Sequence, residues 1–315
     1  MSIKKIAELS GVSPATVSRV LNHPEYKCQS PAVRERIWKA AMQLGYTPNQ
    51  AARNLKLGIV AEQKVYYIGV LMTRTENANL DRMIDEMYLE TTCACDGLII
   101  IGKCNKEALK KLNRKYKCVV SVNRNSTNYE VDEVLCDGRK IAAMAVEHLI
   151  SLGHRNIGYV GNCRNEDRYN GYLDTLKRNN LDVIPEYVVE TNQTEKEGYE
   201  AMEQFLKSDD CPTGIYCAND ITAVGMLKYL GRCRNLYFTP SIIASDDIEE
   251  AQYTKPMLTT VGLPKEEMGK FALYLLLDRM KGGHSGVVRM ELSGHLMIRN
   301  SCSHVSESTW SDYCI

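Results

Sequence analysis

Apolar residues recur every three or four positions between residues 3 and 44, the spacing that places them on one face of an α-helix. Three short helices are predicted in this stretch, two within residues 3–22 and a third over residues 31–45, closed by Gly45 as its C-cap. Gly11 supplies the permissive backbone for a tight turn between the first two helices. Two amphipathic helices joined in this way have the layout of a helix-turn-helix.

One face of each predicted helix is expected to pack into a small common core. In the second helix, Ser13 is the expected N-cap and Pro14 the first helical residue, where a missing N–H costs nothing. The residues expected to point inward are Ile3, Ile6, Ala7, Leu9, Val12, Val17, Val20, Leu21, Val33, Ile37, Ala40, Ala41 and Leu44.

The outer face of the second helix is small or hydroxylated and carries one guanidinium. It presents Pro14, Ala15, Thr16, Ser18 and Arg19. Small side chains permit close approach to a DNA duplex, and an arginine can donate two hydrogen bonds to a guanine or a phosphate. An ordinary helical hairpin shows the same periodicity, so the pattern alone leaves both interpretations open.

The distribution of charge favours DNA binding. The whole chain is neutral, with 39 basic and 39 acidic residues, yet residues 1–58 carry nine basic against three acidic side chains. The remaining residues therefore carry 30 basic and 36 acidic side chains. A basic head neutralises phosphates, while an acidic body is repelled by the duplex.

Short apolar runs alternate with helical stretches from Val65 onward. Runs of this length separated by crossover helices are typical of parallel sheets in an α/β fold. The body spans about 250 residues, more than one such sheet needs, so two lobes are predicted. The runs are YYIGVL, GLIII, KCVVSV, IGYVG, EYVVE, GIYCAN, SIIAS and TTVGL, and the helical segments are 139–152, 167–180, 195–208, 221–231 and 265–281.

Polar side chains follow several of these runs, and ligands of open α/β sheets gather at the carboxyl ends of strands. Carboxylates that accept hydrogen bonds and an arginine that donates in a fork can grip vicinal hydroxyls, so a sugar is the expected ligand. The alternatives are helix caps for Asp220 and Asp247 and a plain strand end for Asn123. For Arg168, the alternative is a surface ion pair with Asp167 or Glu166. These residues are Asn123, Arg124, Arg168, Asn219, Asp220, Asp246 and Asp247.

The segments GVSPATVSRVLN and GYTPNQAARNLKLG resemble the head-piece and hinge of the lactose-repressor (LacI/GalR) family of bacterial transcription regulators. The resemblance extends without a gap across residues 3–58. The resemblance implies that residues 48–56 form a hinge helix only on operator DNA, with Leu55 as a minor-groove wedge. A plain linker is the alternative. The DNA-binding residues it implies are Ser13, Pro14, Ala15, Thr16, Ser18, Arg19, Asn22, Asn49 and Leu55.

The same resemblance implies a periplasmic-binding-protein-like body with the effector in a cleft between the lobes. RYNGYLDTL, CAND and SDDIEEAQYTKPMLTTV match family elements and nominate Arg168, Asn219 and Asp246 as effector contacts. Asn123 stands where the family often has aspartate. Gln193 falls where some relatives carry an aromatic platform, so stacking is expected to be weaker here.

The expected organisation is an α/β protein in three parts. Residues 1–47 form a three-helix helix-turn-helix head-piece, residues 48–63 a hinge helix and linker, and residues 64–315 a two-lobed effector-binding and dimerisation domain with parallel sheets. Lobe 1 is expected over about residues 64–153 and 282–300, lobe 2 over about residues 154–281, and a tail over residues 301–315.

Two places depart from the family pattern. Only one helix and no strand fit between Met72 and Asp96, where the family has a helix, a strand and another helix. A real shortening and unreported residues both explain this interval. The tail after Arg299 lacks the apolar heptads of a tetramerising coiled coil, so a homodimer is expected.

The sequence holds little that points to an enzyme, a metal site or a membrane protein. No phosphate-binding loop or catalytic signature is found, and the 12 cysteines show no repeated Cys-x-x-Cys spacing. No signal peptide or long apolar segment is found either, so free thiols in a cytoplasmic protein are expected. The prediction is a regulator, most consistent with a repressor, that binds near-palindromic operator DNA and a small carbohydrate effector, with no cofactor. An α/β sugar-processing or phosphotransfer enzyme with a helical appendage is the alternative.

Overall fold

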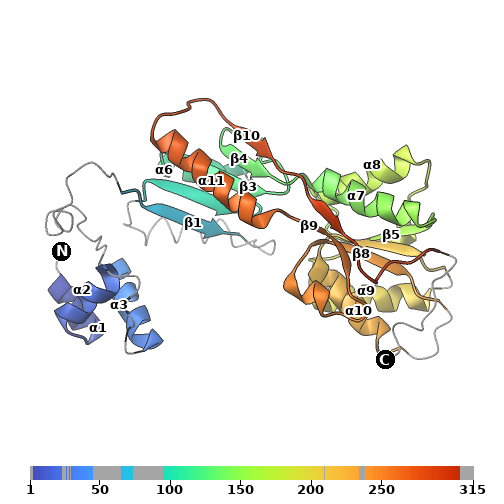
Figure 1. Cartoon of the computed structure of the whole chain (residues 1–315), viewed down its shortest axis with the longest axis horizontal. Helices are drawn as coiled ribbons and strands as arrows, with labels where there is room; N and C mark the ends of the chain where they lie inside the picture. The colour runs from blue at the N-terminus through green and yellow to red at the C-terminus, as the bar shows by residue number, and fades with distance from the viewer. Residues whose placement is uncertain are drawn as a thin grey trace. The chain divides into compact units, whose positions relative to one another are not determined.

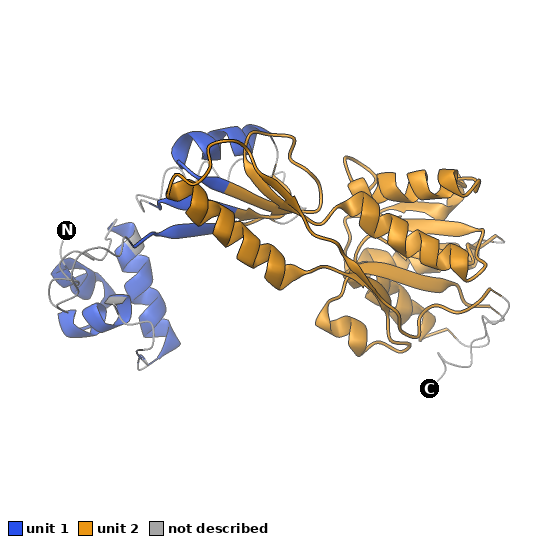
Figure 2. Cartoon of the chain, turned by 45° about the horizontal axis from the view of Figure 1, so that its top comes forward, with its two compact units in different colours: residues 1–71, 77–99, 106–119 blue, residues 72–76, 100–105, 120–315 orange. Residues whose placement is uncertain are grey.

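The computed structural model describes residues 3–22, 26, 28, 30–44, 65–73, 95–104, 106–208, 210–233 and 238–305, apart from the side chains of residues 22 and 42. The chain forms two compact units (Figure 2). One contains residues 1–71, 77–99 and 106–119, and the other contains residues 72–76, 100–105 and 120–315. The predicted hinge and most of the short interval after Met72 lie outside the described residues.

The head-piece consists of α1 (Ile3–Ser10), α2 (Pro14–Asn22) and α3 (Pro31–Gln43), as predicted (Figure 1). Its core is made by the fully buried side chains of Ile6, Val17 and Ile37, with Val20 and three alanines around them. Leu9 is the exception to the predicted core, because 57% of its surface is exposed. By helical spacing, Ser10 lies between Ile3 and Ile6 on the inner face and is buried, whereas Leu9 falls at the edge of that face.

The turn and caps of the head-piece follow the residues that favour them. Gly11 adopts a φ of 66°, a left-handed conformation that costs a glycine little. The Ser13 hydroxyl accepts a hydrogen bond from the Thr16 amide at 3.1 Å, which caps α2. Ser30 caps α3 in the same way, through the Val33 amide at 3.2 Å. Gly45, the predicted C-cap, lies outside the described residues.

The first sheet has the strand order β1-β2-β3-β4-β10. Its strands are β1 (Ile68–Met72), β2 (Gly97–Ile101), β3 (Val119–Asn123), β4 (Asp132–Leu135) and β10 (Arg289–Glu291). β4 pairs in parallel with both β3 and β10. Helix α6 (Lys106–Lys115) connects β2 to β3, and α11 (Lys265–Met280) packs on β4 (Figure 1).

The second sheet has the order β11-β9-β8-β7-β5-β6. Its pairs are parallel except that β11 runs antiparallel to β9. Its core includes Val160, Phe205, Ile215, Met226 and Ile242. The strands are β5 (Ile157–Gly161), β6 (Val188–Glu190), β7 (Gly214–Cys217), β8 (Ser241–Asp246), β9 (Thr259–Gly262) and β11 (His295–Met297), and the helices are α7 (Gly138–Ser151), α8 (Asp167–Arg178), α9 (Glu195–Lys207) and α10 (Asp220–Leu230).

All eight apolar runs form strands and all five helical segments form helices, so the two-sheet α/β body is confirmed. Three packing relations differ from the expected lobe boundaries. Helix α7 packs against β7, β8 and β9 of the second sheet, whereas α11 packs against the first. β11 joins the second sheet, although residues 282–300 were expected in the first lobe. The chain therefore passes between the two sheets after β4, after β9 and after β10.

β4 is buried although its sequence, DEVL, reads as half charged. Asp132 and Glu133 are both fully buried, and each is surrounded by donors. Asp132 accepts from Arg279 Nη2 at 2.6 Å, and His284 Nε2 lies 2.9 Å from its other oxygen. Burial raises the pKa of Asp132, but the bonds to Arg279, the Val288 amide and His284 outweigh burial and lower it. Glu133 accepts from the Thr127 amide at 2.7 Å and from Arg289 Nε at 3.0 Å.

Candidate functional site

The surface of α2 predicted to meet DNA is open. Pro14, Ala15 and Arg19 are exposed, and Thr16 and Ser18 are half-buried. The Arg19 guanidinium lies 5.8 Å from the centre of the Tyr26 ring. Ser13 already uses its hydroxyl as the helix cap, so its contribution to this surface is to fix the start of α2. The side chain of Asn22, and Asn49 and Leu55 altogether, lie outside the described residues.

The second candidate site lies within the larger unit, where loops that follow β2 and β3 meet loops that follow β5, β7 and β8. An ion pair joins Lys103, after β2, to Glu166, between β5 and α8, with 2.6 Å between Nζ and Oε2. A second joins Arg124, after β3, to Asp246, at the end of β8, at 2.7 Å. We refer to the region where these loops meet as the cleft.

Arg168, at the start of α8, is buried, and its guanidinium already donates hydrogen bonds to other residues. Only 3% of its surface is exposed, and its Nε donates to Glu166 Oε1 at 2.8 Å. Its Nη1 donates to the Ala218 carbonyl and its Nη2 to Gln193 Oε1 at 3.1 Å. Burial lowers the pKa of Arg168, but the adjacent Glu166 outweighs burial and raises it. The guanidinium stays charged and serves mainly to hold three other cleft residues in place.

Glu166 is the partner of two cations. Its side chain is fully buried, with Arg168 on one oxygen and Lys103 on the other. Burial alone would raise the pKa of this carboxyl, but the charges of Arg168 and Lys103 hold it at about 2. The Glu166 Oε1 atom also approaches the Arg168 amide at 3.4 Å and so caps α8.

Gln193 and Asn219 extend the same network. Gln193 sits at a φ of 64°, and its carbonyl accepts from Asn219 Nδ2 at 3.1 Å. The other end of the Asn219 amide caps α10 by accepting from the Thr222 amide at 3.2 Å. Asn219 thus serves as the helix cap, a role that was only the alternative interpretation of its neighbour Asp220, and its side chain is shared between two structural contacts.

The segment after β8 is held in an uncommon backbone conformation. Asp246 and Asp247 have φ values of 134° and 48°, a region that side chains other than glycine rarely occupy. The Asp220 carboxylate fixes this segment, since its Oδ2 accepts from the Ile248 amide at 2.9 Å and its Oδ1 from Thr260 Oγ1 at 2.5 Å. Burial raises the pKa of Asp220 to about 6, although these two bonds lower it. Asp247 pairs with Arg299 at 2.6 Å.

The structure joins Arg168, Gln193 and Asn219 in one chain of contacts and Arg124 and Asp246 in a separate ion pair. Two further residues of the chain of contacts were not nominated from the sequence. Asn123 adjoins the ion pair, where its side-chain oxygen accepts from the Arg124 amide at 2.7 Å. The missed residues are Lys103 and Glu166. Lys103 follows the buried run GLIII by two positions, which was a usable signal, whereas Glu166 looked like a surface partner of Arg168 and proves to be a buried one.

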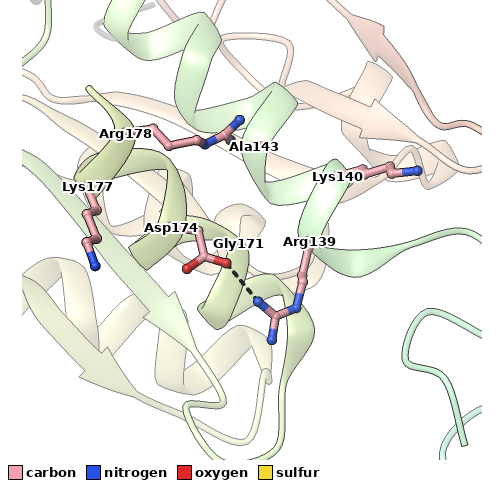
Figure 3. Close-up of a pocket in the computed structure, with 7 residues that line it drawn as sticks. All are labelled: Arg139, Lys140, Ala143, Gly171, Asp174, Lys177 and Arg178. Carbon is pink, nitrogen blue, oxygen red and sulfur yellow. Dashed lines mark hydrogen bonds and ion pairs between the residues drawn. The ribbon is translucent and has the colours of Figure 1, made fainter. Parts of the chain in front are cut away.

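A separate depression of about 440 Å³ lies between α7 and α8 (Figure 3). It forms because Gly171 lets the helices touch, since a Cβ there would lie 2.5 Å from the Arg139 carbonyl. Three of its four lining cations are paired, Arg139 with Asp174 at 2.7 Å, Lys140 with Glu291 at 2.5 Å and Arg178 with Glu147 at 3.4 Å. These pairs account for the charges of the lining apart from that of Lys177.

Metal and membrane sites were also sought among the described residues. No group of three or more His, Cys, Asp or Glu side chains is placed to hold a metal ion there. Within the same residues, no helix combines the length and apolar character needed to cross a bilayer.

Known proteins resemble both parts of the chain. Residues 2–49 match the family of bacterial regulatory proteins of the lacI family, and residues 146–302 match the periplasmic binding protein-like domain. The HTH-type transcriptional repressor CytR of Escherichia coli (strain K12) is 30% identical over 332 residues, covering 95% of this chain and 96% of the relative. The HTH-type transcriptional repressor PurR of Haemophilus influenzae (strain PittGG) is 27% identical, covering 96% and 99%.

Solved structures show the same fold. The Lac repressor bound to ONPG in its repressed state has a TM-score of 0.68 at 21% identity, covering 96% of this chain and 99% of that one. A complex of the transcriptional regulator CelR with cellobiose has a TM-score of 0.65 at 23% identity, covering 96% and 100%. The alignment with CytR is longer than the 315 residues of this chain, so CytR carries positions that this chain lacks.

Three observations indicate the same family. They are the head-piece with an open α2 surface, the two-sheet body and the similarity to a repressor over nearly the full chain. Membership also decides against the alternative of a sugar-processing enzyme, because the family consists of regulators. The chain belongs to the LacI family of bacterial regulatory proteins.

Proposed function

We propose that this protein is a transcriptional repressor that binds a near-palindromic operator as a homodimer and changes its operator affinity when a small carbohydrate-like effector enters the cleft. The open N-terminal part of α2 carries the DNA-binding half of this proposal, because its exposed side chains are those suited to a major groove. The network of polar side chains at the ends of β3, β5, β7 and β8 supports the effector half. A DNA-bound role places the protein in the cytoplasm.

The structure favours a division of labour among the residues nominated for the effector. Arg168 has each of its nitrogen atoms bonded to protein, so we assign it the positioning of Glu166 and Gln193 rather than the main ligand contact. Arg124 and Asp246 are 31% and 15% exposed at the side chain, and they are better placed to exchange their mutual ion pair for ligand hydroxyls. The solved CelR structure is a complex with cellobiose, and that of a LacI family transcriptional regulator from Enterococcus faecium contains bound ribose, which supports a carbohydrate.

The hinge and the homodimer remain part of the proposal. We infer that residues 48–63 connect the two functions and that Leu55 opens the central step of the operator. A two-fold protein reads a near-palindrome with two identical heads. Ile221, Tyr253 and Met257 expose 37%, 75% and 44% of their surfaces, and a second copy of the chain would remove such apolar area from water.

A selection of duplexes from a random library, followed by fluorescence anisotropy, tests the DNA-binding half. Arg19→Ala should weaken specific binding by about 1–3 kcal/mol and relax the preferred sequence. Arg178→Ala, which removes an exposed arginine from the body, is the matched control and should bind as the unaltered protein does. The same affinity for every duplex in the unaltered protein would overturn the proposal.

A further inference from the structure

The cleft has more hydrogen-bond donors than acceptors left over at one end. Contacts run without a break from Lys103 to Glu166, from Glu166 to Arg168, from Arg168 to Gln193 and from Gln193 to Asn219. We refer to the end of the cleft formed by Lys103, Glu166 and Gln193 as the cationic end. Within it, both Glu166 oxygens already accept from cations, so the only carboxylate there is fully committed.

Gln193 supplies the first unused donor. Its Nε2 atom is buried and has no hydrogen-bond partner among the described residues. The orientation of this amide is fixed, because Arg168 can only donate and therefore requires the oxygen of Gln193. The NH₂ group then presents two N–H bonds that need an acceptor, and a buried polar group without a partner is costly.

Lys103 supplies the second unused hydrogen-bond donor. Its ammonium has three N–H bonds, and the described contact with Glu166 uses one of them. Its side chain is 31% exposed, so it can reach a molecule in the cleft, whereas Glu166 and Arg168 are buried behind it. Lys103 and Arg168 share a single carboxylate, so these three residues together carry one net positive charge, and Asp246, whose charge also acts on Arg168, is already paired with Arg124.

The opposite end of the cleft is balanced. Asp246 is paired with Arg124, and Asp247 is paired with Arg299. The remaining carboxylate, Asp220, is fully buried with both oxygens accepting from the protein, so it does not contact a ligand. Arg124 Nη1 and Asp246 Oδ1 make no hydrogen bond among the described residues, but their opposite charges lie 2.7 Å apart and offset each other. The charge that is not offset therefore lies at the end of the cleft that holds Lys103 and Gln193.

We infer that the effector carries an anionic oxygen group, a phosphate ester or a carboxylate, which accepts hydrogen bonds from Lys103 Nζ and Gln193 Nε2. This inference rests on the proposed function and refines its effector from a neutral sugar to an acidic sugar derivative. Hydroxyls of the same molecule would meet Arg124 and Asp246. Lys103 and Gln193 are then the residues that select the charge of the ligand.

Thermal unfolding of the full chain in matched ligand pairs tests the charge requirement. The pairs are ribose with ribose 5-phosphate, glucose with glucose 6-phosphate, glucose with glucuronate, and inorganic phosphate against chloride at equal ionic strength. The anionic members should raise the melting temperature, and their neutral partners should not, because a ligand stabilises the state that binds it. The phosphate and carboxylate arms distinguish the two sources of the negative group.

Lys103→Gln should weaken binding of the stabilising anion at least tenfold in calorimetry. Gln193→Glu keeps an oxygen for Arg168 but replaces the free NH₂ with a second acceptor, and it should cause a similar loss. Lys196→Gln, at an exposed lysine that is paired with Glu200 on α9, is the matched control and should bind as the unaltered protein does. Circular dichroism of each variant verifies that it is folded.

Two results would overturn the inference. One is a neutral sugar that stabilises the protein as much as its phosphate or carboxylate form. The other is the absence of stabilisation by every anion, inorganic phosphate included. Operator binding without effector is measured on the same preparations, so a protein that binds its operator but shows no preference for anions fails this inference alone. A protein that binds no duplex fails the proposed function.

Discussion

The head-piece and the cleft use polar side chains in opposite ways. On α2, Pro14, Ala15 and Arg19 are exposed and have few partners in the protein, so each is available to DNA by itself. In the cleft, Glu166 and Arg168 are buried and bonded to each other, and their neighbours depend on them. A motif therefore describes the function of a head-piece residue directly, but in the cleft it identifies a position whose role depends on its partners.

The difference follows from solvation. An exposed guanidinium is hydrated and needs no protein partner before it binds a phosphate. A buried guanidinium is stable in the folded protein only when a carboxylate and carbonyl groups surround it. Arg19 and Arg168 are the same residue type with opposite requirements. Removing a partner should be costly in the cleft and mild on the head-piece.

The largest effect is expected at Glu166. Glu166→Gln leaves Arg168 and Lys103 without their shared negative charge, and breaking a buried ion pair from one side costs about 3–5 kcal/mol. Urea unfolding at pH 7 measures the loss. The matched control is Glu147→Gln, whose exposed pair with Arg178 at 3.4 Å should contribute less than about 1 kcal/mol. Equal losses for the two variants would break the comparison.

An intermediate effect is expected at Asp220, and its sign depends on pH. The pKa of this carboxyl is raised to about 6, so the folded state holds its proton more tightly than the unfolded chain does. Its contribution to stability is therefore greatest below the unfolded pKa near 3.8 and falls as the pH rises towards 6, by about 3 kcal/mol in total.

Asp220→Asn keeps an oxygen for the Ile248 amide and an NH₂ group for Thr260 Oγ1. The difference in unfolding free energy between this variant and the unaltered protein should change in favour of the variant between pH 4 and pH 7. Asp174→Asn, at a side chain that is 58% exposed, serves as the control and should show no such trend. A difference that is constant with pH would contradict the role given to Asp220.

The smallest effect is expected at the head-piece cap. Ser13→Ala removes the acceptor of the Thr16 amide and should destabilise α2 by about 1 kcal/mol. Hydrogen exchange of the amides of residues 15–22 in the full chain should become about fivefold faster. Ser13→Thr retains a hydroxyl and should restore most of the protection. Unchanged exchange in the alanine variant would show that the cap is dispensable.

Most of the fold could be predicted from the sequence because the spacing of apolar residues indicates which segments form helices and which form strands. The strands from β5 to β9 read as buried runs, and the turn at Gly11 and the cap at Ser13 follow from local chemistry. β4 could not be predicted, because its buried Asp132 and Glu133 resemble surface residues until Arg279 and Arg289 are brought to them from more than 140 positions away. Long-range ion pairs leave no local periodicity.

The candidate site was predicted in part for the same reason. Residues that end apolar runs, such as Asn219 and Asp246, lie where the pattern places them. The positions of Lys103 and Glu166 depend on two loops 63 residues apart meeting each other, and that meeting has no local signal. Which of the cleft residues remain free to bind is a property of the network rather than of any motif.

The ion pairs Lys103–Glu166 and Arg124–Asp246 affect how strongly a ligand can change the affinity for operator DNA. Because they connect loops that follow strands of the two sheets, a molecule that binds across the cleft must replace some of these existing bonds, in addition to using the Gln193 donor that has no partner among the described residues. Only the difference between old and new bonds is then available to shift the equilibrium towards or away from operator DNA. We therefore expect operator affinity to change little with ligands that bind at one end of the cleft and to change strongly with ligands that bind at both ends.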